Sequence, residues 1–104
     1  MAYQVRNSAV VFGGHDTWLK AFRPMVCGKI RFVGKEDRLF STALIRNAEV
    51  VWIQPNAIGH KVFYRLINEA RRYRKPVRYF ANASAGKCAQ QLIEYDKARG
   101  NSND

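Results

Sequence analysis

Short apolar runs alternate with longer amphipathic segments along this chain. The apolar runs are rich in β-branched and aromatic residues, and they predict four strands, at about 8–12, 29–33, 50–53 and 77–80. Apolar residues at helical spacing follow each run, and they predict a helix from Asp16 onward and three more at about 36–46, 60–74 and 86–97. We expect residues 1–7 to be a polar lead-in and residues 98–104 a polar tail. The pattern is strand followed by helix, four times.

Each predicted helix has an apolar face and recognisable ends. We expect Asp16 to cap the first helix, and Pro24 and Gly28 to end it. The segment 60–74 has the clearest period of 3.6 residues, so Phe63 and Leu66 are predicted to be core. The other predicted buried positions are Trp18, Leu19, Phe22 and Met25 in the first helix, Leu39, Phe40, Ala43 and Leu44 in the second, and Cys88, Leu92 and Tyr95 in the last.

Strand–helix alternation with short connections predicts a parallel sheet with helices on both faces. The run at 50–53 is apolar on both faces and should be central, whereas 29–33 alternates and fits a strand at the side of the sheet. The expected fold is a single α/β domain, Rossmann-like or flavodoxin-like, with strand order 2-1-3-4 and a core at about 8–97. In such sheets, ligands bind where the parallel strands end, which we call the C-terminal edge.

Composition narrows the classes of function. The chain has 104 residues, 47% of them hydrophobic, and no apolar run long enough to span a membrane. Its start lacks the apolar core of a signal peptide, so we expect a cytoplasmic protein with Cys27 and Cys88 as reduced thiols. Lys and Arg number 18 against 8 acids, which gives a net charge of +10. This excess favours a polyanionic partner, and a merely solubilising basic surface is the alternative.

The best candidate site follows the first strand at Gly13-Gly14. The surrounding spacing matches neither a dinucleotide fingerprint nor a phosphate-binding loop, and we predict no cofactor. Two glycines make a turn, and they also allow backbone N–H groups to approach an anion. The only histidines, His15 and His60, should lie on adjacent strand ends, where they are candidates for acid–base or metal chemistry. No carboxylate or thiolate completes a metal site, so we predict no metal.

Three lysines, Lys35, Lys61 and Lys87, come just after strand exits, near helix N-termini that disfavour positive charge. We interpret them as cations that meet a negative ligand; the alternative is that they point into solvent. The predicted ligand-binding residues are therefore Gly13, Gly14, His15, Asn56, His60, Lys61, Ser84 and Lys87.

The densest basic run is Arg71, Arg72, Arg74 and Lys75, at the end of the third predicted helix. Cations there complement the helix dipole, and together with aromatic residues they are also typical of a surface for nucleic-acid backbone. Residues expected near this strip are Arg6, Lys29, Tyr73, Arg78 and Tyr79.

Four short motifs carry a resemblance to a known family: Gly13-Gly14-His15, Ala48-Glu49-Val50-Val51, Gly59-His60 and Lys75-Pro76. In their order and spacing the chain resembles the small bacterial Rossmann-like proteins catalogued as domain of unknown function 2325, over about Val10 to Ile93. It departs from them at Gly59, where that family has Ser. The resemblance implies the fold and the importance of the glycine pair and both histidines, and it implies no activity.

The leading hypothesis from the sequence is a binding protein for an anionic ligand, either a nucleotide or the phosphates of a nucleic acid, at the C-terminal edge. Two alternatives stay open. One is a small enzyme that uses His15 and His60, and the other is a homodimeric interaction module.

Overall fold

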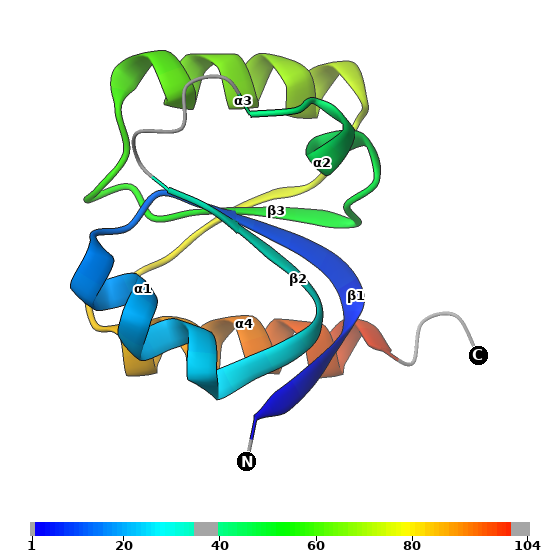
Figure 1. The fold of residues 1–104 in the computed structure, drawn as a ribbon. Coiled ribbons are helices and arrows are strands. Elements are labelled where there is room, and N and C mark those ends of the chain that lie inside the picture. Colours follow the sequence, from blue (N-terminus) through cyan, green and yellow to red (C-terminus); the bar gives the residue numbers. More distant parts are fainter. Residues whose placement is uncertain (1, 35–39, 101–104) are drawn as a thin grey trace.

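A parallel four-stranded sheet forms the centre of the molecule, in a computed structural model that describes residues 2–34 and 40–100 (Figure 1). All three strand pairings are parallel and the order is β2-β1-β3-β4, which confirms the predicted topology. The elements are β1 (Tyr3–Phe12), α1 (Asp16–Phe22), the 3₁₀ turn η1 (Arg23–Met25), β2 (Val26–Val33), α2 (Ala43–Arg46), β3 (Val50–Ile53), α3 (His60–Arg72), β4 (Val77–Tyr79) and α4 (Ala85–Gly100).

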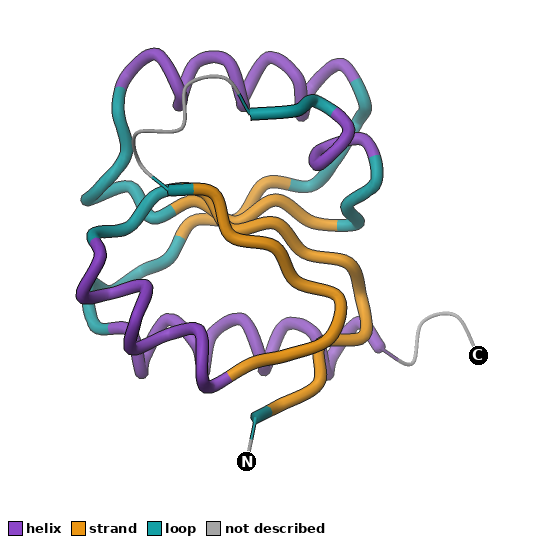
Figure 2. Tube along the Cα trace, viewed as in Figure 1, coloured by secondary structure: helices purple, strands orange, loops and turns teal. Residues whose placement is uncertain are grey.

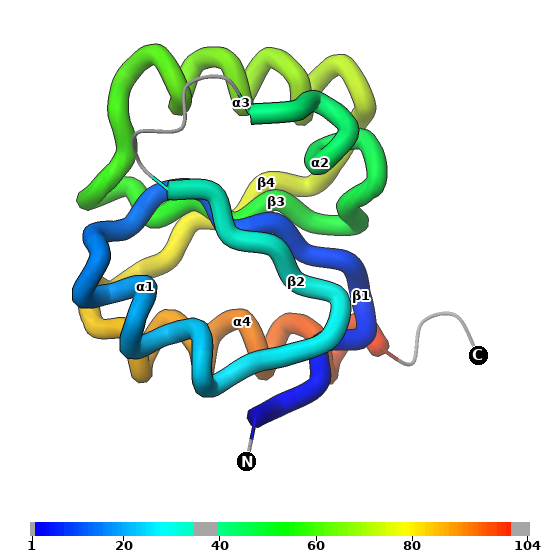
Figure 3. The backbone as a smooth tube through the Cα atoms, in the orientation of Figure 1, coloured from blue at the N-terminus to red at the C-terminus, as the bar shows by residue number. Residues whose placement is uncertain are grey.

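Helices cover both faces of the sheet, as Figure 2 shows by colour and Figure 3 by chain order. On the face with α1 and α4, aromatic rings fill the core, and Trp52 stacks on Phe80 with 4.8 Å between ring centroids. On the face with α2 and α3, the core includes Phe12, Ile45 and Leu66. Because β3 lies inside the sheet and is covered on both faces, all four of its residues are buried, as its doubly apolar sequence predicted.

The prediction of a polar lead-in over residues 1–7 was wrong, because β1 begins at Tyr3 rather than at Ser8. Tyr3 to Val5 pair with the first residues of β2, which begins at Val26 rather than at Lys29. Gly28 therefore lies within a strand, where its φ of +88° and the nearby Val5 carbonyl disfavour a side chain. Between Val5 and Ala9 the pairing with β2 shifts in a bulge.

A buried carboxylate on α4 accepts hydrogen bonds from the residues of this bulge. Asp96 Oδ1 accepts hydrogen bonds from the Asn7 N–H at 2.9 Å and from Asn7 Nδ2 at 3.0 Å. Its Oδ2 accepts from the Arg6 N–H at 3.0 Å and from the Tyr3 hydroxyl at 2.6 Å. The C-terminal end of α4 is thereby tied to the first half of β1, and the buried polar groups of the bulge have hydrogen-bond partners within the protein.

Three predictions about the helices also change. The N-cap position of α1 is His15, and Asp16 is already the first helical residue, so Asp16 is not the cap. Met25 is exposed rather than core, because the chain leaves the α-helical spacing at η1. Within the described residues, the helix predicted at 36–46 is the single turn α2, whose buried residue is Ile45. Leu39 lies outside the described residues.

Candidate anion-binding surfaces

The glycine pair after β1 is a tight turn rather than a pair of free donors. The Gly13 N–H donates to the Val33 carbonyl at 2.9 Å, and the Gly14 N–H donates to the Ala57 carbonyl at 2.7 Å. Both residues have positive φ, +94° and +101°, and a Cβ on Gly14 would lie 2.3 Å from a ring carbon of Trp18. Both N–H groups therefore have partners within the protein, and glycine is required here by backbone conformation and close packing. The role of the pair as anion donors stays a prediction.

Both histidines lie at the C-terminal edge, as the topology predicted, but no contact joins them within the described part of the chain. His15 is exposed at the N-cap of α1. His60 is the exposed first residue of α3, and its ring stacks on Tyr64 one turn later, with 6.5 Å between centroids. The observed partner of the His60 imidazole is thus an aromatic ring on the same helix.

A buried polar cluster that was not recognised in the sequence joins two loops of this edge. Gln54, 2% exposed, donates from Nε2 to the Asn82 carbonyl at 3.2 Å and to Cys88 Sγ at 3.6 Å. Its Oε1 accepts from the Asn56 N–H at 3.3 Å. Burial raises the pKa of the Cys88 thiol, which also donates to the Asn82 carbonyl at 3.1 Å. The cluster holds the β3–α3 and β4–α4 loops together, and it leaves Asn56 itself exposed.

The remaining residues predicted at this edge are exposed and separate. Lys61 is in the first turn of α3, and Lys87 is in the first turn of α4. Ser84 precedes α4, and its carbonyl accepts the Cys88 N–H. No recorded contact among the described residues brings these side chains to one point, and Lys35 lies outside the described residues.

Along α3, in contrast, the structure gathers residues from both surfaces considered in the sequence. Its buried residues are Val62, Leu66 and Ala70, so the opposite side of the helix faces solvent. We call this side the α3 outer face, and its exposed residues are His60, Lys61, Tyr64, Asn68, Arg71 and Arg72. None of the six is acidic. Beside them, Arg65 packs over the Phe40 ring at 4.3 Å.

The chain beyond α3 adds further positive charge. The Lys75 N–H donates to the Ala70 carbonyl and the Arg74 N–H to the Arg71 carbonyl, which is the Schellman helix ending. Arg74 has a φ of +56° at the position that usually holds glycine. Six of the 18 Lys and Arg residues lie between positions 61 and 75, together with a single acid, Glu69.

The other residues expected near the basic run at 71–75 divide between the two faces of the sheet. Arg78 lies over the Tyr95 ring of α4 at 5.0 Å, so it belongs to the opposite face. Lys29 is on β2, on the face of the sheet that α2 and α3 cover. The basic surface is thus a property of α3 and its C-terminal end, rather than of all strand starts.

No group of three or more metal-ligating side chains forms among residues 2–34 and 40–100. Within the same ranges, no helix combines the length and hydropathy needed to cross a membrane. No family model, curated protein or solved structure matches this chain. The resemblance to domain of unknown function 2325 stays a prediction.

Proposed function

We propose that this protein binds single-stranded nucleic acid through the α3 outer face. The observation that carries the proposal is an exposed helix face with several cations, an accessible aromatic ring and no carboxylate. α3 has 13 residues, so the face is about 20 Å long and spans several phosphates of an extended strand.

The cations are free to contact phosphate. Lys61 and Arg71 have no carboxylate partner within the described residues, and the pair between Arg72 and Glu69, at 3.9 Å and on a mostly exposed Arg, is too weak to neutralise the face. Arg74 and Lys75 extend the positive charge past the helix end. Such surfaces bind by releasing counterions, so the affinity falls as salt rises.

The aromatic residue favours single strands over duplex. Tyr64 is 63% exposed, and its ring lies nearly parallel to the His60 ring, with 22° between the planes. Unpaired bases stack on rings of this kind whatever their sequence, whereas duplex bases are already stacked. We therefore expect little sequence preference. Under this proposal the protein works in the cytoplasm and needs no cofactor.

Fluorescence anisotropy with labelled oligo(dT), oligo(U) and a DNA duplex of about 12 nucleotides tests the proposal, at salt from about 50 to 200 mM. The variant Lys61→Gln/Arg71→Gln removes two cations without breaking the Arg72–Glu69 pair. We expect the slope of log affinity against log salt to become shallower by about 1.4 on single strands. Tyr64→Ser should lower the affinity for single strands and leave the affinity for duplex unchanged.

The matched control is Lys20→Gln/Lys97→Gln, which removes the same charge from α1 and α4. A similar loss of slope in the control would show that only net charge matters. Undetectable binding of every oligonucleotide by the unmodified protein at the lowest salt would overturn the proposal.

A further inference from the structure

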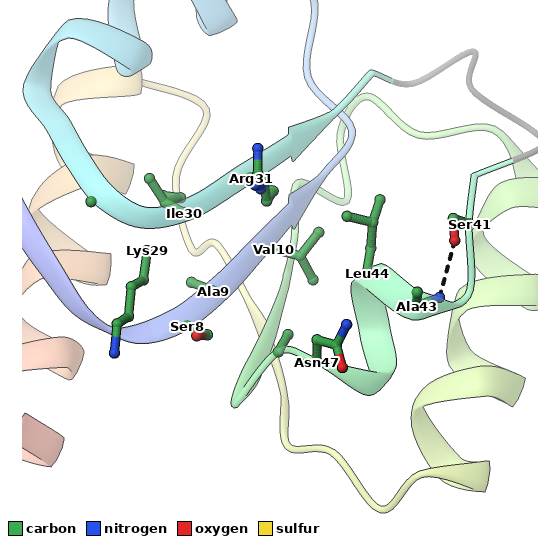
Figure 4. A pocket seen from close by; sticks show the side chains of 12 residues that line it. Ser8, Ala9, Val10, Lys29, Ile30, Arg31, Ser41, Ala43, Leu44 and Asn47 are labelled. Carbon is green, nitrogen blue, oxygen red and sulfur yellow. Dashed lines mark hydrogen bonds between the residues drawn. The ribbon is translucent and has the colours of Figure 1, made fainter.

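A cavity of about 520 Å³ opens between the β1–β2 side of the sheet and α2, well away from the α3 outer face (Figure 4). α2, which borders the cavity, is a single turn of four residues. Its size falls in the range of small-molecule sites. The residues that line it are Ser8, Ala9, Val10, Gly28, Lys29, Ile30, Arg31, Ser41, Ala43, Leu44, Asn47 and Ala48.

Two cations of β2 stand on the cavity side of the sheet. Arg31 pairs with Val10, whose side chain belongs to the core beneath α2 and α3, and Lys29 lies two residues earlier on the same face. Both are exposed, and neither forms an ion pair with any residue that the structure describes. Among residues 2–34 and 40–100, no acidic residue lines the cavity.

The rest of the lining divides into a polar and an apolar part. Ser8 and Asn47 present a hydroxyl and an amide, and the Ser41 hydroxyl accepts the Ala43 N–H at 3.2 Å, which leaves its own proton to donate. Val10 and Leu44 approach the cavity from opposite sides in Figure 4. The lining therefore offers cations, hydroxyl groups and an amide as well as apolar side chains.

We propose that this cavity binds a small organic phosphate, with the phosphate at Lys29 and Arg31 and the organic group against Val10 and Leu44. A phosphomonoester carries a charge of about −1.5 to −2 at pH 7 and so balances two cations, whereas a single carboxylate leaves one unpaired. Arg and hydroxyl donors suit the several oxygens of a phosphate. The site is separate from the proposed nucleic-acid surface and does not depend on it.

The experiment is a two-dimensional ¹H–¹⁵N NMR titration with phenyl phosphate, inorganic phosphate and benzoate. We expect phenyl phosphate to shift the amide signals of Ser8, Arg31 and Asn47 and to bind more tightly than the other two probes. Lys29→Gln and Arg31→Gln should each weaken phenyl phosphate by about tenfold or more, because each removes a charged hydrogen bond. Leu44→Ala should weaken phenyl phosphate several-fold and leave inorganic phosphate unchanged.

The control Lys20→Gln/Lys97→Gln should bind phenyl phosphate like the unmodified protein, and the dispersion of each spectrum shows that the variant is folded. Three results would overturn the proposal. They are shifts spread over all basic surfaces, unchanged affinity in both Lys29→Gln and Arg31→Gln, and benzoate binding as tightly as phenyl phosphate.

Discussion

Asp96→Asn tests whether a single buried carboxylate holds the first half of β1 in the sheet. Asp96 is 3% exposed, and its two oxygens accept four hydrogen bonds, from Tyr3, from the Arg6 N–H, and from the backbone and side chain of Asn7. Asparagine has the same shape and only one acceptor oxygen. The substitution therefore changes acceptor number and charge without opening a cavity.

The expected cost follows from which donors lose their acceptor. If the Asn oxygen keeps the two bonds to Asn7, its NH₂ group faces the Tyr3 hydroxyl, which rotates to accept, and the Arg6 N–H, which does not. Losing a bond to a charged acceptor costs about 1.5–3 kcal/mol, and a buried donor without a partner costs about 1–3 kcal/mol. These two costs partly describe the same lost hydrogen bond and do not add in full. We therefore expect the free energy of unfolding to fall by about 3 kcal/mol.

Urea titration followed by tryptophan fluorescence measures this change, since Trp18 and Trp52 are both buried. With a slope of about 1–3 kcal/mol per molar urea, the midpoint should fall by about 1–3 M. Glu94→Gln, an exposed acid of the same helix, is the matched control and should change the midpoint little. A loss below about 1 kcal/mol in Asp96→Asn would refute the argument, because it would mean that the bonds contribute no more than surface contacts.

The same network predicts the pH dependence of stability. Burial alone would raise the pKa of Asp96, but hydrogen bonds from Tyr3, Arg6 and Asn7 outweigh burial and lower it. A lowered pKa gives stability that is present above the unfolded value of about 3.9 and is lost as the pH falls through the folded value. For Tyr3, burial and the bond to Asp96 raise the pKa to about 12, so its contribution is present below about pH 10 and is lost as the pH rises toward 12. Asp96→Asn should flatten the acid side of the profile, and Tyr3→Phe the alkaline side.

Three further measurements test the packing. In a urea titration, Leu66→Ala should lower the free energy of unfolding by about 2–5 kcal/mol, because Leu66 is buried. The exposed control Asn68→Ala should change it little. Equal effects of the two substitutions would contradict the assignment of the α3 faces. Arg74→Gly should raise stability by roughly 0.5–1 kcal/mol because it relieves a φ of +56°, whereas Arg74→Ala keeps the Cβ and should not. A thiol reagent should label exposed Cys27 quickly and buried Cys88 only on unfolding, so fast labelling of the Cys27→Ala variant would contradict the burial of Cys88.

The parts of the fold that depend on local patterns were predictable. The central place of β3 followed from four consecutive apolar residues, and the outer place of β2 from the alternation of Lys29 and Arg31 with Ile30 and Phe32. Given those two places, short right-handed connections leave few orders for the remaining strands. The place of β4 at the other side of the sheet, next to β3, followed in the same way.

The features that were not predicted depend on contacts between residues that are distant in sequence. Gln4, Arg6 and Asn7 give the start of β1 a polar pattern, and it is a strand because Asp96, about ninety residues away, satisfies the bulge. An acid eight residues after Cys88, on the buried side of α4, was the available signal, since the two positions share a helix face. The amides of Gly13 and Gly14 find their partners in Val33 and Ala57, on other loops, and no local spacing reveals this.

Lys61 of the predicted lysine rim and the basic run at 71–75 lie at the two ends of α3, and this makes their contributions separable by ligand length. α3 runs from the C-terminal edge at His60 to the basic run at Arg72, about 20 Å, which is roughly twice the screening length at physiological salt. A mononucleotide reaches one end only, so its affinity should respond to Lys61→Gln or to Arg71→Gln, but not to both. A strand that spans the face contacts both ends, and the two substitutions should then lower its affinity independently, with losses that add in free energy. If the affinity for a long oligonucleotide changed with only one of the two substitutions, as expected for a mononucleotide, α3 would carry a local anion site rather than a nucleic-acid surface. Measuring both ligands on both single variants therefore decides between the two forms of anion binding that the sequence left open.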